Sequence, residues 1–205
     1  ALCRGKHPYH GTMDASMWND RYEASELVWG KGANQFLPPL VEDLAPGRAL
    51  DVASGEGRNA IWLARQGWDV MAVDFSATGI DKARTLAGDT VVDWVVGDVT
   101  AYEPEGVFDL VVVFYLHLMP SDLADAFALA TAALAPGGTF FAVGHALANL
   151  TDGHGGPQYA DVLWTEELIA PMVEGLTVVE LGERLRPVPD ADATAIDVVV
   201  HATAP

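Results

Sequence analysis

The stretch that decides the fold is Asp51-Val52-Ala53-Ser54-Gly55-Glu56-Gly57-Arg58-Asn59-Ala60, which follows an apolar run and leads into a helical pattern. Glycines at 55 and 57 permit a tight strand-to-helix turn and let a ligand approach the backbone closely. Residues 55–60 also fit the looser G-x-G-x-x-A dinucleotide pattern. Taken alone, this match is equally compatible with an ordinary loop. The neighbouring residues are therefore needed to distinguish a ligand-binding turn from an ordinary loop.

Acidic residues follow the neighbouring predicted strands. Asp74 ends the second strand, about twenty residues beyond the glycines, where a carboxylate can accept both hydroxyls of a ribose. Asp98 ends the third strand and can accept a hydrogen bond from an exocyclic amine such as that of adenine. A single aspartate after a strand is more often a helix cap. Three such acids at one sheet edge, counting Asp51, favour a ligand site.

The apolar periodicity predicts an α/β protein. Five strand-like runs are separated by segments with helical spacing, and they lie at 48–53, 69–73, 91–96, 108–114 and 139–143. Unbroken Val, Leu and Phe runs between helices indicate a parallel sheet covered on both faces. Two further strands, 177–185 and 195–202, are joined without room for a crossover helix, so we expect them to form an antiparallel hairpin. Helices are expected near 18–24, 35–44 and 166–173.

Composition narrows the function. The 205 residues carry 11 Lys and Arg against 29 Asp and Glu, a formal net charge of −18, which disfavours nucleic acid and membrane surfaces as partners. The single Cys3 allows no internal disulfide. Pro136-Gly137-Gly138 interrupts the uncharged run 126–151, so that run is not expected to cross a membrane. No signal peptide is visible and the six histidines lack metal-binding spacing, so we expect a cytoplasmic protein without a metal site.

The domain organisation is expected to be simple. Residues 1–12 match nothing downstream and read as a tag or an extended start, and 13–205 read as one domain. Within it, 13–45 should form N-terminal cap helices. The Gly-rich stretch 146–162 should form a lid loop over the site.

In this order the motifs resemble those of class I S-adenosylmethionine-dependent methyltransferases, and the likeness runs from Met17 to the end. The resemblance implies a Rossmann-like, doubly wound, seven-stranded sheet, mostly parallel with an antiparallel C-terminal hairpin, and S-adenosyl-L-methionine as cofactor. A nicotinamide-binding fold normally continues parallel instead. The family usually has glycine where this chain has Ala53. The cofactor residues that the resemblance implies are Asp51, Ala53, Ser54, Gly55, Gly57, Asn59, Asp74, Phe75, Asp98, Val99 and Phe114.

The upstream stretch Trp18-Asn19-Asp20-Arg21-Tyr22, followed by Trp29, is similar to the N-terminal cap of small-molecule methyltransferases related to tellurite-resistance and thiopurine enzymes. This likeness implies that Arg21 binds the methionine carboxylate of the cofactor, which suits the planar fork of arginine. Tyr22 and Trp29 would then close over the methionine arm, and Trp18 is implied as a further cofactor residue. The alternative is an amphipathic helix that packs by its aromatic residues and leaves Arg21 in water.

The acceptor should lie beyond the fourth and fifth strands. His117 and His145 follow these strands and are the candidate bases, although either histidine alone is as easily a polar loop residue. The residues expected to line the acceptor pocket are Tyr115, His154, Tyr159 and Trp164. We expect in-line methyl transfer to a small-molecule O, N, S or chalcogen nucleophile by a monomer or homodimer. A non-catalytic S-adenosylmethionine sensor and an NAD(P)-dependent oxidoreductase are the alternatives.

Overall fold

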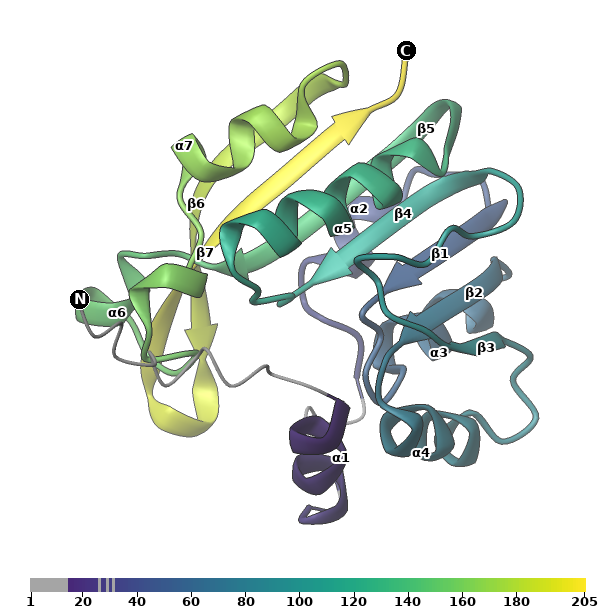
Figure 1. Cartoon of the computed structure of the whole chain (residues 1–205), viewed down its shortest axis with the longest axis horizontal. Helices are drawn as coiled ribbons and strands as arrows, with labels where there is room; N and C mark the ends of the chain where they lie inside the picture. Colours follow the sequence, from purple (N-terminus) through teal and green to yellow (C-terminus); the bar gives the residue numbers. More distant parts are fainter. Residues whose placement is uncertain (1–14, 26, 29, 31) are drawn as a thin grey trace, which may run out of the picture.

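The computed structural model describes residues 15–25, 27–28, 30 and 32–205. Its centre is a seven-stranded sheet in the order β3-β2-β1-β4-β5-β7-β6 (Figure 1). The strands are β1 (Arg48–Val52), β2 (Asp69–Asp74), β3 (Asp93–Val96), β4 (Phe108–Phe114), β5 (Leu134–His145), β6 (Thr177–Val188) and β7 (Ala193–Thr203). Strands β1 to β5 pair in parallel, whereas β7 is antiparallel to both β5 and β6. The predicted sheet and its antiparallel C-terminal hairpin are therefore confirmed.

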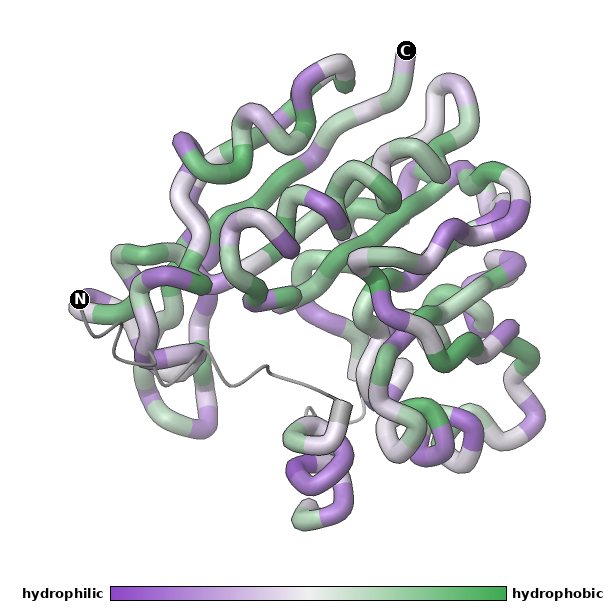
Figure 2. Tube along the Cα trace, viewed as in Figure 1, coloured by the Kyte–Doolittle hydropathy of each residue, from purple (hydrophilic) through white to green (hydrophobic). Residues whose placement is uncertain are grey.

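Helices cover both faces of this sheet. They are α1 (Ala15–Glu23), α2 (Leu37–Val41), α3 (Arg58–Arg65), α4 (Ala77–Ala87), α5 (Pro120–Ala132), α6 (Asn149–Asp152) and α7 (Glu166–Ile169). Side chains of α5 and α7, including Phe127 and Ile169, pack on one face with Phe140. Leu37 of α2 and Leu63 of α3 pack on the other. Figure 2 shows the result as strongly apolar central strands between helices of mixed polarity.

Several boundaries differ from the sequence-based expectation. The expected helix at 35–44 is only five residues long, and the helix at 166–173 changes into a 3-10 turn from Ala170, because Pro171 has no N–H to donate. The fifth strand begins earlier, at Leu134, and its pairing shifts between Phe108 and Leu110 of β4. The insertion of Pro136-Gly137-Gly138 is thus accommodated inside the strand as an irregularity.

This topology creates the edge where a ligand can bind. The carboxyl ends of β1, β2, β4 and β5 lie along one side of the sheet, and the start of the antiparallel β7 joins them there. The strand order reverses between β1 and β4, which is the usual place for a binding crevice in open α/β sheets. No helix in the described ranges is both long enough and apolar enough to span a membrane.

Candidate functional site

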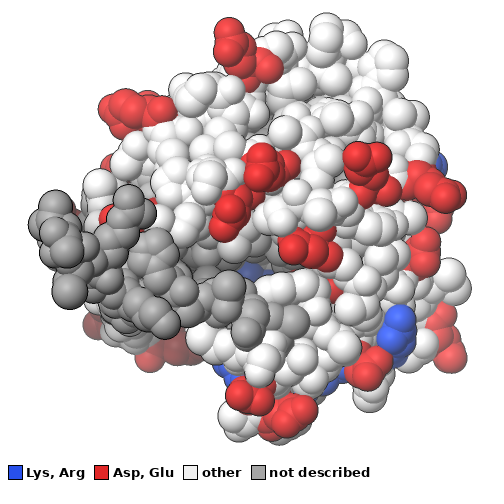
Figure 3. Space-filling view, viewed as in Figure 1, with Lys and Arg blue, Asp and Glu red and all other residues white. Residues whose placement is uncertain are grey.

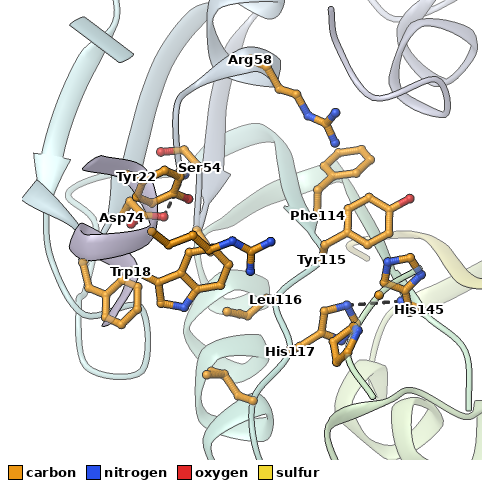
Figure 4. A pocket seen from close by; sticks show the side chains of 17 residues that line it. Trp18, Tyr22, Ser54, Arg58, Asp74, Phe114, Tyr115, Leu116, His117 and His145 are labelled. Carbon is orange, nitrogen blue, oxygen red and sulfur yellow. Dashed lines mark hydrogen bonds between the residues drawn. The ribbon is translucent and has the colours of Figure 1, made fainter. Parts of the chain in front are cut away.

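A cavity of about 290 Å³ opens at this carboxyl edge, close to the smaller volumes of known ligand pockets. Figure 4 shows Ser54, Asp74 and Tyr22 at one end and Tyr115, His117 and His145 at the other. The structure brings together most of the expected site residues in the lining, namely Trp18, Arg21, Tyr22, Ala53, Ser54, Gly55, Asp74, Phe75, Phe114, Tyr115, His117 and His145. The lining also includes Arg58, Leu116 and Leu118, which were not predicted, and Gly156 and Pro157, which belong to the predicted lid loop 146–162.

The glycine turn forms one wall of the cavity and has a left-handed backbone. Its φ angles are 59° at Ala53, 55° at Gly55 and 76° at Gly57. Ala53 therefore adopts a conformation that favours glycine, the residue usual at this position in the resembling family. A side chain at Gly57 would meet the ring of Trp94 at 2.3 Å, so Gly57 serves the packing of the turn and does not line the cavity.

Asp74 supplies a buried carboxylate beside this turn. Its two oxygens accept hydrogen bonds from the backbone N–H groups of Gly55 at 2.8 Å and Ser76 at 2.9 Å. Burial raises the pKa of Asp74, and the two backbone hydrogen bonds partly oppose the rise. The hydroxyl oxygen of Ser54 is buried nearby and has no hydrogen-bond partner among the described residues. The turn therefore presents a fixed carboxylate and a hydroxyl that no described residue hydrogen-bonds.

Asp51 and Asn59 support the turn from beneath and do not line the cavity. Asp51 is 1% exposed and accepts a hydrogen bond from the Ala60 N–H at 3.0 Å, which ties β1 to the start of α3. Burial raises the pKa of Asp51 to about 7, against the effect of that hydrogen bond, and the negative charge of Asp74 adds to the rise. Asn59 accepts from the Asn34 N–H at 2.8 Å and so anchors the N-terminal segment.

Helix α1 covers the cavity from the side of α4. The side-chain oxygen of Asn19 accepts a hydrogen bond from the Ser76 hydroxyl at 2.6 Å, at the N-terminus of α4. Arg21 lines the cavity with its guanidinium carbon 4.8 Å from the Trp18 ring centroid, and Tyr22 is buried. These positions agree with a cap that faces the ligand. Trp29 lies outside the described residues.

A partly buried ion pair that the sequence analysis did not single out holds this cap in place. Lys82 of α4 donates to the carbonyl oxygens of Tyr22 and Ser25, both at 2.6 Å, and to the Glu56 carboxylate at 3.1 Å. Glu56 also accepts from the Val28 N–H at 2.8 Å. The middle residue of the glycine turn thus holds the segment that follows α1.

The two histidines at the other end of the cavity have different surroundings. His117 is buried, with Nδ1 3.0 Å from the carbonyl oxygen of Val162, while its Nε2 accepts from the His145 N–H at 3.5 Å. Burial lowers the pKa of His117 to about 4, helped by the charge of His145, so the ring is neutral. Both of its ring nitrogens are engaged with backbone groups. The His145 ring stacks on it at 5.4 Å, and the buried Nδ1 of His145 makes no hydrogen bond to any of the described residues.

Next to His145 lies a buried charged cluster that the sequence analysis missed. Asp197 of β7 is fully buried, and one of its carboxylate oxygens is 3.1 Å from Nδ1 of His145. The other oxygen accepts from the Tyr115 hydroxyl at 3.1 Å and from Nε of Arg186 at the end of β6. Tyr115 has a φ of 57°, a rare conformation for a large side chain that often marks a functional site.

Besides Asp51, Gly57 and Asn59, five more expected residues lie outside the cavity lining. Asp98 is exposed and accepts hydrogen bonds from the backbone and hydroxyl of Thr100, so its carboxylate caps the turn after β3. Val99 lines a separate small cavity instead. Trp164 is completely buried in the core, edge-on to Phe127 at 5.5 Å. His154 and Tyr159 lie on the exposed side of the lid, which contributes Gly156 and Pro157 to the cavity.

The described residues contain no group of three potential metal ligands. The sheet order, mostly parallel with an antiparallel C-terminal pair, is the Rossmann-like fold found in class I S-adenosylmethionine-dependent methyltransferases. Residues 49–138 match the family model described as a methyltransferase domain. The match covers the glycine turn and Asp74 and supports a methyltransferase domain at the centre of the chain.

Solved structures of methyltransferases share the whole fold. The N-methyltransferase NodS from Bradyrhizobium japonicum WM9, in complex with S-adenosyl-L-homocysteine, is 19% identical with a TM-score of 0.74, over 94% of this chain and 99% of that one. TehB from Haemophilus influenzae is 14% identical with a TM-score of 0.70, over 93% and 67%. Magnesium protoporphyrin IX methyltransferase from Synechocystis PCC 6803 with bound SAM is 14% identical with a TM-score of 0.66, over 95% and 99%. These likenesses show the fold.

A shorter match comes from a curated sequence. The ribosomal RNA small subunit methyltransferase C of Alcanivorax borkumensis is 34% identical over 68 residues, which are 33% of this chain and 21% of that protein. The chain thus corresponds to about a fifth of that relative's length.

Proposed function

We propose that the protein transfers the methyl group of S-adenosylmethionine to a small-molecule acceptor. The observation that carries this proposal is the single cavity that joins the glycine turn and Asp74 to the histidines at the ends of β4 and β5. A volume of about 290 Å³ and a cover formed by α1 and the lid suit small ligands rather than a macromolecule. Acidic side chains spread over the face in Figure 3, consistent with the net charge of −18, and this charge opposes binding to an RNA backbone.

The lining fits the cofactor in chemical terms. The Asp74 carboxylate keeps lone pairs for ribose hydroxyls, and the buried Ser54 hydroxyl has no partner among the described residues. At Gly55 the absence of a side chain permits close approach to the backbone. Arg21, at the cavity wall, suits a carboxylate such as that of the methionine arm. When bound, S-adenosylmethionine supplies a methyl carbon activated by a positively charged sulfur.

The contribution of the chain to such a reaction is mainly positioning. Holding the two reactants at near-attack distance can lower the barrier by about 7 to 11 kcal/mol in favourable cases. The cap held by Lys82 and the lid residues Gly156 and Pro157 restrict access of water to the cavity, which removes the hydration shell of the nucleophile.

Calorimetric titration with S-adenosyl-L-homocysteine tests the cradle. We expect Asp74→Ala to weaken binding by about 1 to 3 kcal/mol, roughly tenfold to a hundredfold in Kd, because charge-assisted hydrogen bonds are lost. Asp69→Ala is the matched control, since Asp69 begins the same strand at the opposite edge and is exposed. An unchanged Kd in Asp74→Ala contradicts the assigned cradle, and binding of NAD in place of S-adenosyl-L-homocysteine favours an oxidoreductase.

A product-release assay then separates enzyme from sensor. Wild-type protein with S-adenosylmethionine and a panel of phenols, heterocyclic amines, thiols and chalcogen anions should release S-adenosyl-L-homocysteine with at least one acceptor. Tight cofactor binding without turnover on any acceptor would indicate a sensor.

A further inference from the structure

The buried cluster around Asp197 indicates how the acceptor is activated, an inference that rests on the proposed function. Asp197 comes from β7, His145 from the end of β5, Arg186 from β6 and Tyr115 from the residue after β4. Two of the three contacts of Asp197 join distant parts of the chain, since the Tyr115–Asp197 bond spans 82 residues, and only the Arg186 contact lies within one hairpin. The sheet order β4-β5-β7-β6 is what brings them together at the carboxyl edge.

Asp197 is held as a carboxylate in one orientation. Burial alone would raise its pKa, but the polar contacts and positive charges of His145 and Arg186 outweigh burial and lower it. Arg186 contacts both carboxylate oxygens, and its guanidinium also lies over the Tyr115 ring at 5.5 Å. The Tyr115 hydroxyl stays protonated and donates to Asp197. Burial raises the pKa of this hydroxyl, and the negative charge of Asp197 adds to the rise. These contacts therefore fix the orientation of the Asp197 carboxylate and keep it ionised near neutral pH.

The orientation of His145 follows from this arrangement. The Asp197 carboxylate oxygen lies 3.1 Å from Nδ1 of His145, a charge contact that lacks hydrogen-bond geometry. The nearby negative charge favours the tautomer that carries its proton at Nδ1, which leaves Nε2 as a proton acceptor. His145 lines the cavity, whereas His117 uses both nitrogens on backbone groups. Gly156 of the lid lies directly against the His145 ring, because a side chain there would come within 2.9 Å of Nε2.

We propose that His145 is the general base of the methyl transfer, that Asp197 is its positioning residue, and that the acceptor is a small molecule with an ionisable hydroxyl of the phenol or enol type. The acceptor O–H gives its proton to Nε2 of His145, and the oxygen lone pair forms the bond to the methyl carbon. The carbon–sulfur bond breaks with its electron pair going to sulfur, and the imidazolium later releases the proton to water. Acceptors that carry a lone pair without a proton to lose, such as tertiary amines, gain nothing from this arrangement.

Charged and titratable groups face His145 from several elements of the fold. They are Asp197 from β7, Arg186 from β6, and Tyr115 and His117 from the segment after β4. Gly156, on the lid side, carries no charge. Since the nearest charge is the Asp197 carboxylate, replacing it by an amide should make protonation of the cluster less favourable and move the acidic limb of the pH–rate profile to lower pH.

Kinetics with a panel of phenols provide the first test. We expect His145→Gln to lower kcat by about 10²- to 10⁴-fold on phenols while the Kd for S-adenosyl-L-homocysteine stays within about twofold. Asp197→Asn should lower kcat and shift the acidic limb of kcat/KM. His201→Gln, on the same strand as Asp197 but beside Phe141, is the matched control and should behave as wild type. His145→Gln with wild-type kcat on phenols overturns the proposal.

Nitrogen NMR of the histidine side chains tests the geometry without cofactor or turnover. In wild-type protein at pH 8, His145 should show a protonated Nδ1 and an unprotonated Nε2, a result that does not depend on whether any variant folds. The opposite tautomer overturns the proposal. If wild-type protein binds S-adenosyl-L-homocysteine but methylates only thiols or tertiary amines, the proposal is overturned and the proposed function stands. If wild-type protein does not bind S-adenosyl-L-homocysteine, the proposed function itself is refuted.

Discussion

Asp51 offers a quantitative test of the structure because it is a carboxylate buried beneath the glycine turn. We predict that Asp51→Asn gains stability over wild type as the pH rises. The difference in free energy of unfolding between the variant and wild type should be larger at pH 8 than at about pH 5.5. The folded-state pKa of Asp51 is about 7, above the ordinary value of 3.8. Between these values the folded state binds more protons than the unfolded state, so wild-type stability falls as pH rises. Asparagine does not titrate and can still accept from the Ala60 N–H.

The size of the effect follows from the pKa. Each pH unit below the folded pKa changes the contribution of Asp51 to stability by about 1.4 kcal/mol, so about 2 kcal/mol separates pH 5.5 from pH 8. Contributions of groups common to both proteins cancel in the difference between variant and wild type. Any cost of the amide N–H₂ group is the same at both pH values and also cancels.

Urea unfolding followed by far-UV circular dichroism, performed at the two pH values, measures this difference. The advantage of Asp51→Asn over wild type should grow by about 2 kcal/mol from pH 5.5 to pH 8. Asp89→Asn makes the same chemical change at an exposed position after α4 and should show no pH-dependent gain. A difference that stays below about 0.5 kcal/mol, or that has the opposite sign, would refute the claim that burial controls the charge of Asp51.

Two further substitutions probe the backbone of the site. Ala53→Gly should raise stability by up to about 1 kcal/mol in thermal unfolding, because φ is 59° there, whereas Ala64→Gly within α3 should lower it by about 0.5 to 1 kcal/mol. Asn149→Ala should lower stability by about 1 to 3 kcal/mol and speed proteolysis within 153–158, because the buried N–H of Ile196 and the carbonyl of Gly155 lose their partner. Destabilisation by Ala53→Gly, or an Asn149→Ala lid that resists protease as wild type does, would contradict these assignments.

Most of the fold could be predicted because a parallel sheet leaves a strong pattern. Strand β4 has the predicted bounds, since both of its faces are buried and the apolar run is unbroken. The end of the chain was predictable by a different argument, because the connection between its strands is too short for a crossover. The limits of β5 were not, because Pro136-Gly137-Gly138 reads as a break although it lies within the strand.

The cofactor half of the site was easier to predict than the acceptor half. Asp74, Ser54 and Gly55 are fixed by local chain geometry at strand ends, so their sequence positions place them at the sheet edge. Asp197 depends on the antiparallel order of distant strands, and its sequence neighbours do not reveal its partners. A signal was nevertheless present, since an aspartate inside the apolar run of β7 must be paired when buried.

The lid shows a different limit of sequence reasoning. An aromatic residue after a Gly-rich loop can face a pocket or the core, and Trp164 takes the core because Gly144 leaves room for its ring. Asn149 likewise reads as a loop residue but bridges Gly155 and Ile196. Both outcomes depend on packing between segments that are distant in the sequence, and the sequence pattern does not predict which of these segments meet.

The residues that bind the cofactor and the residues around Asp197 come from different parts of the chain, which has a consequence for protein engineering. The cofactor cradle is built from the carboxyl ends of β1 and β2 and from helix α1. Asp197 and Arg186 instead belong to the hairpin of β6 and β7 at the other side of the sheet. That hairpin touches the rest of the sheet through one seam, between β5 and β7. A grafted hairpin that preserves this seam would exchange Asp197 and Arg186 while leaving His145 and the cofactor-binding residues in place, so the surroundings of His145 could be varied by recombining one contiguous segment.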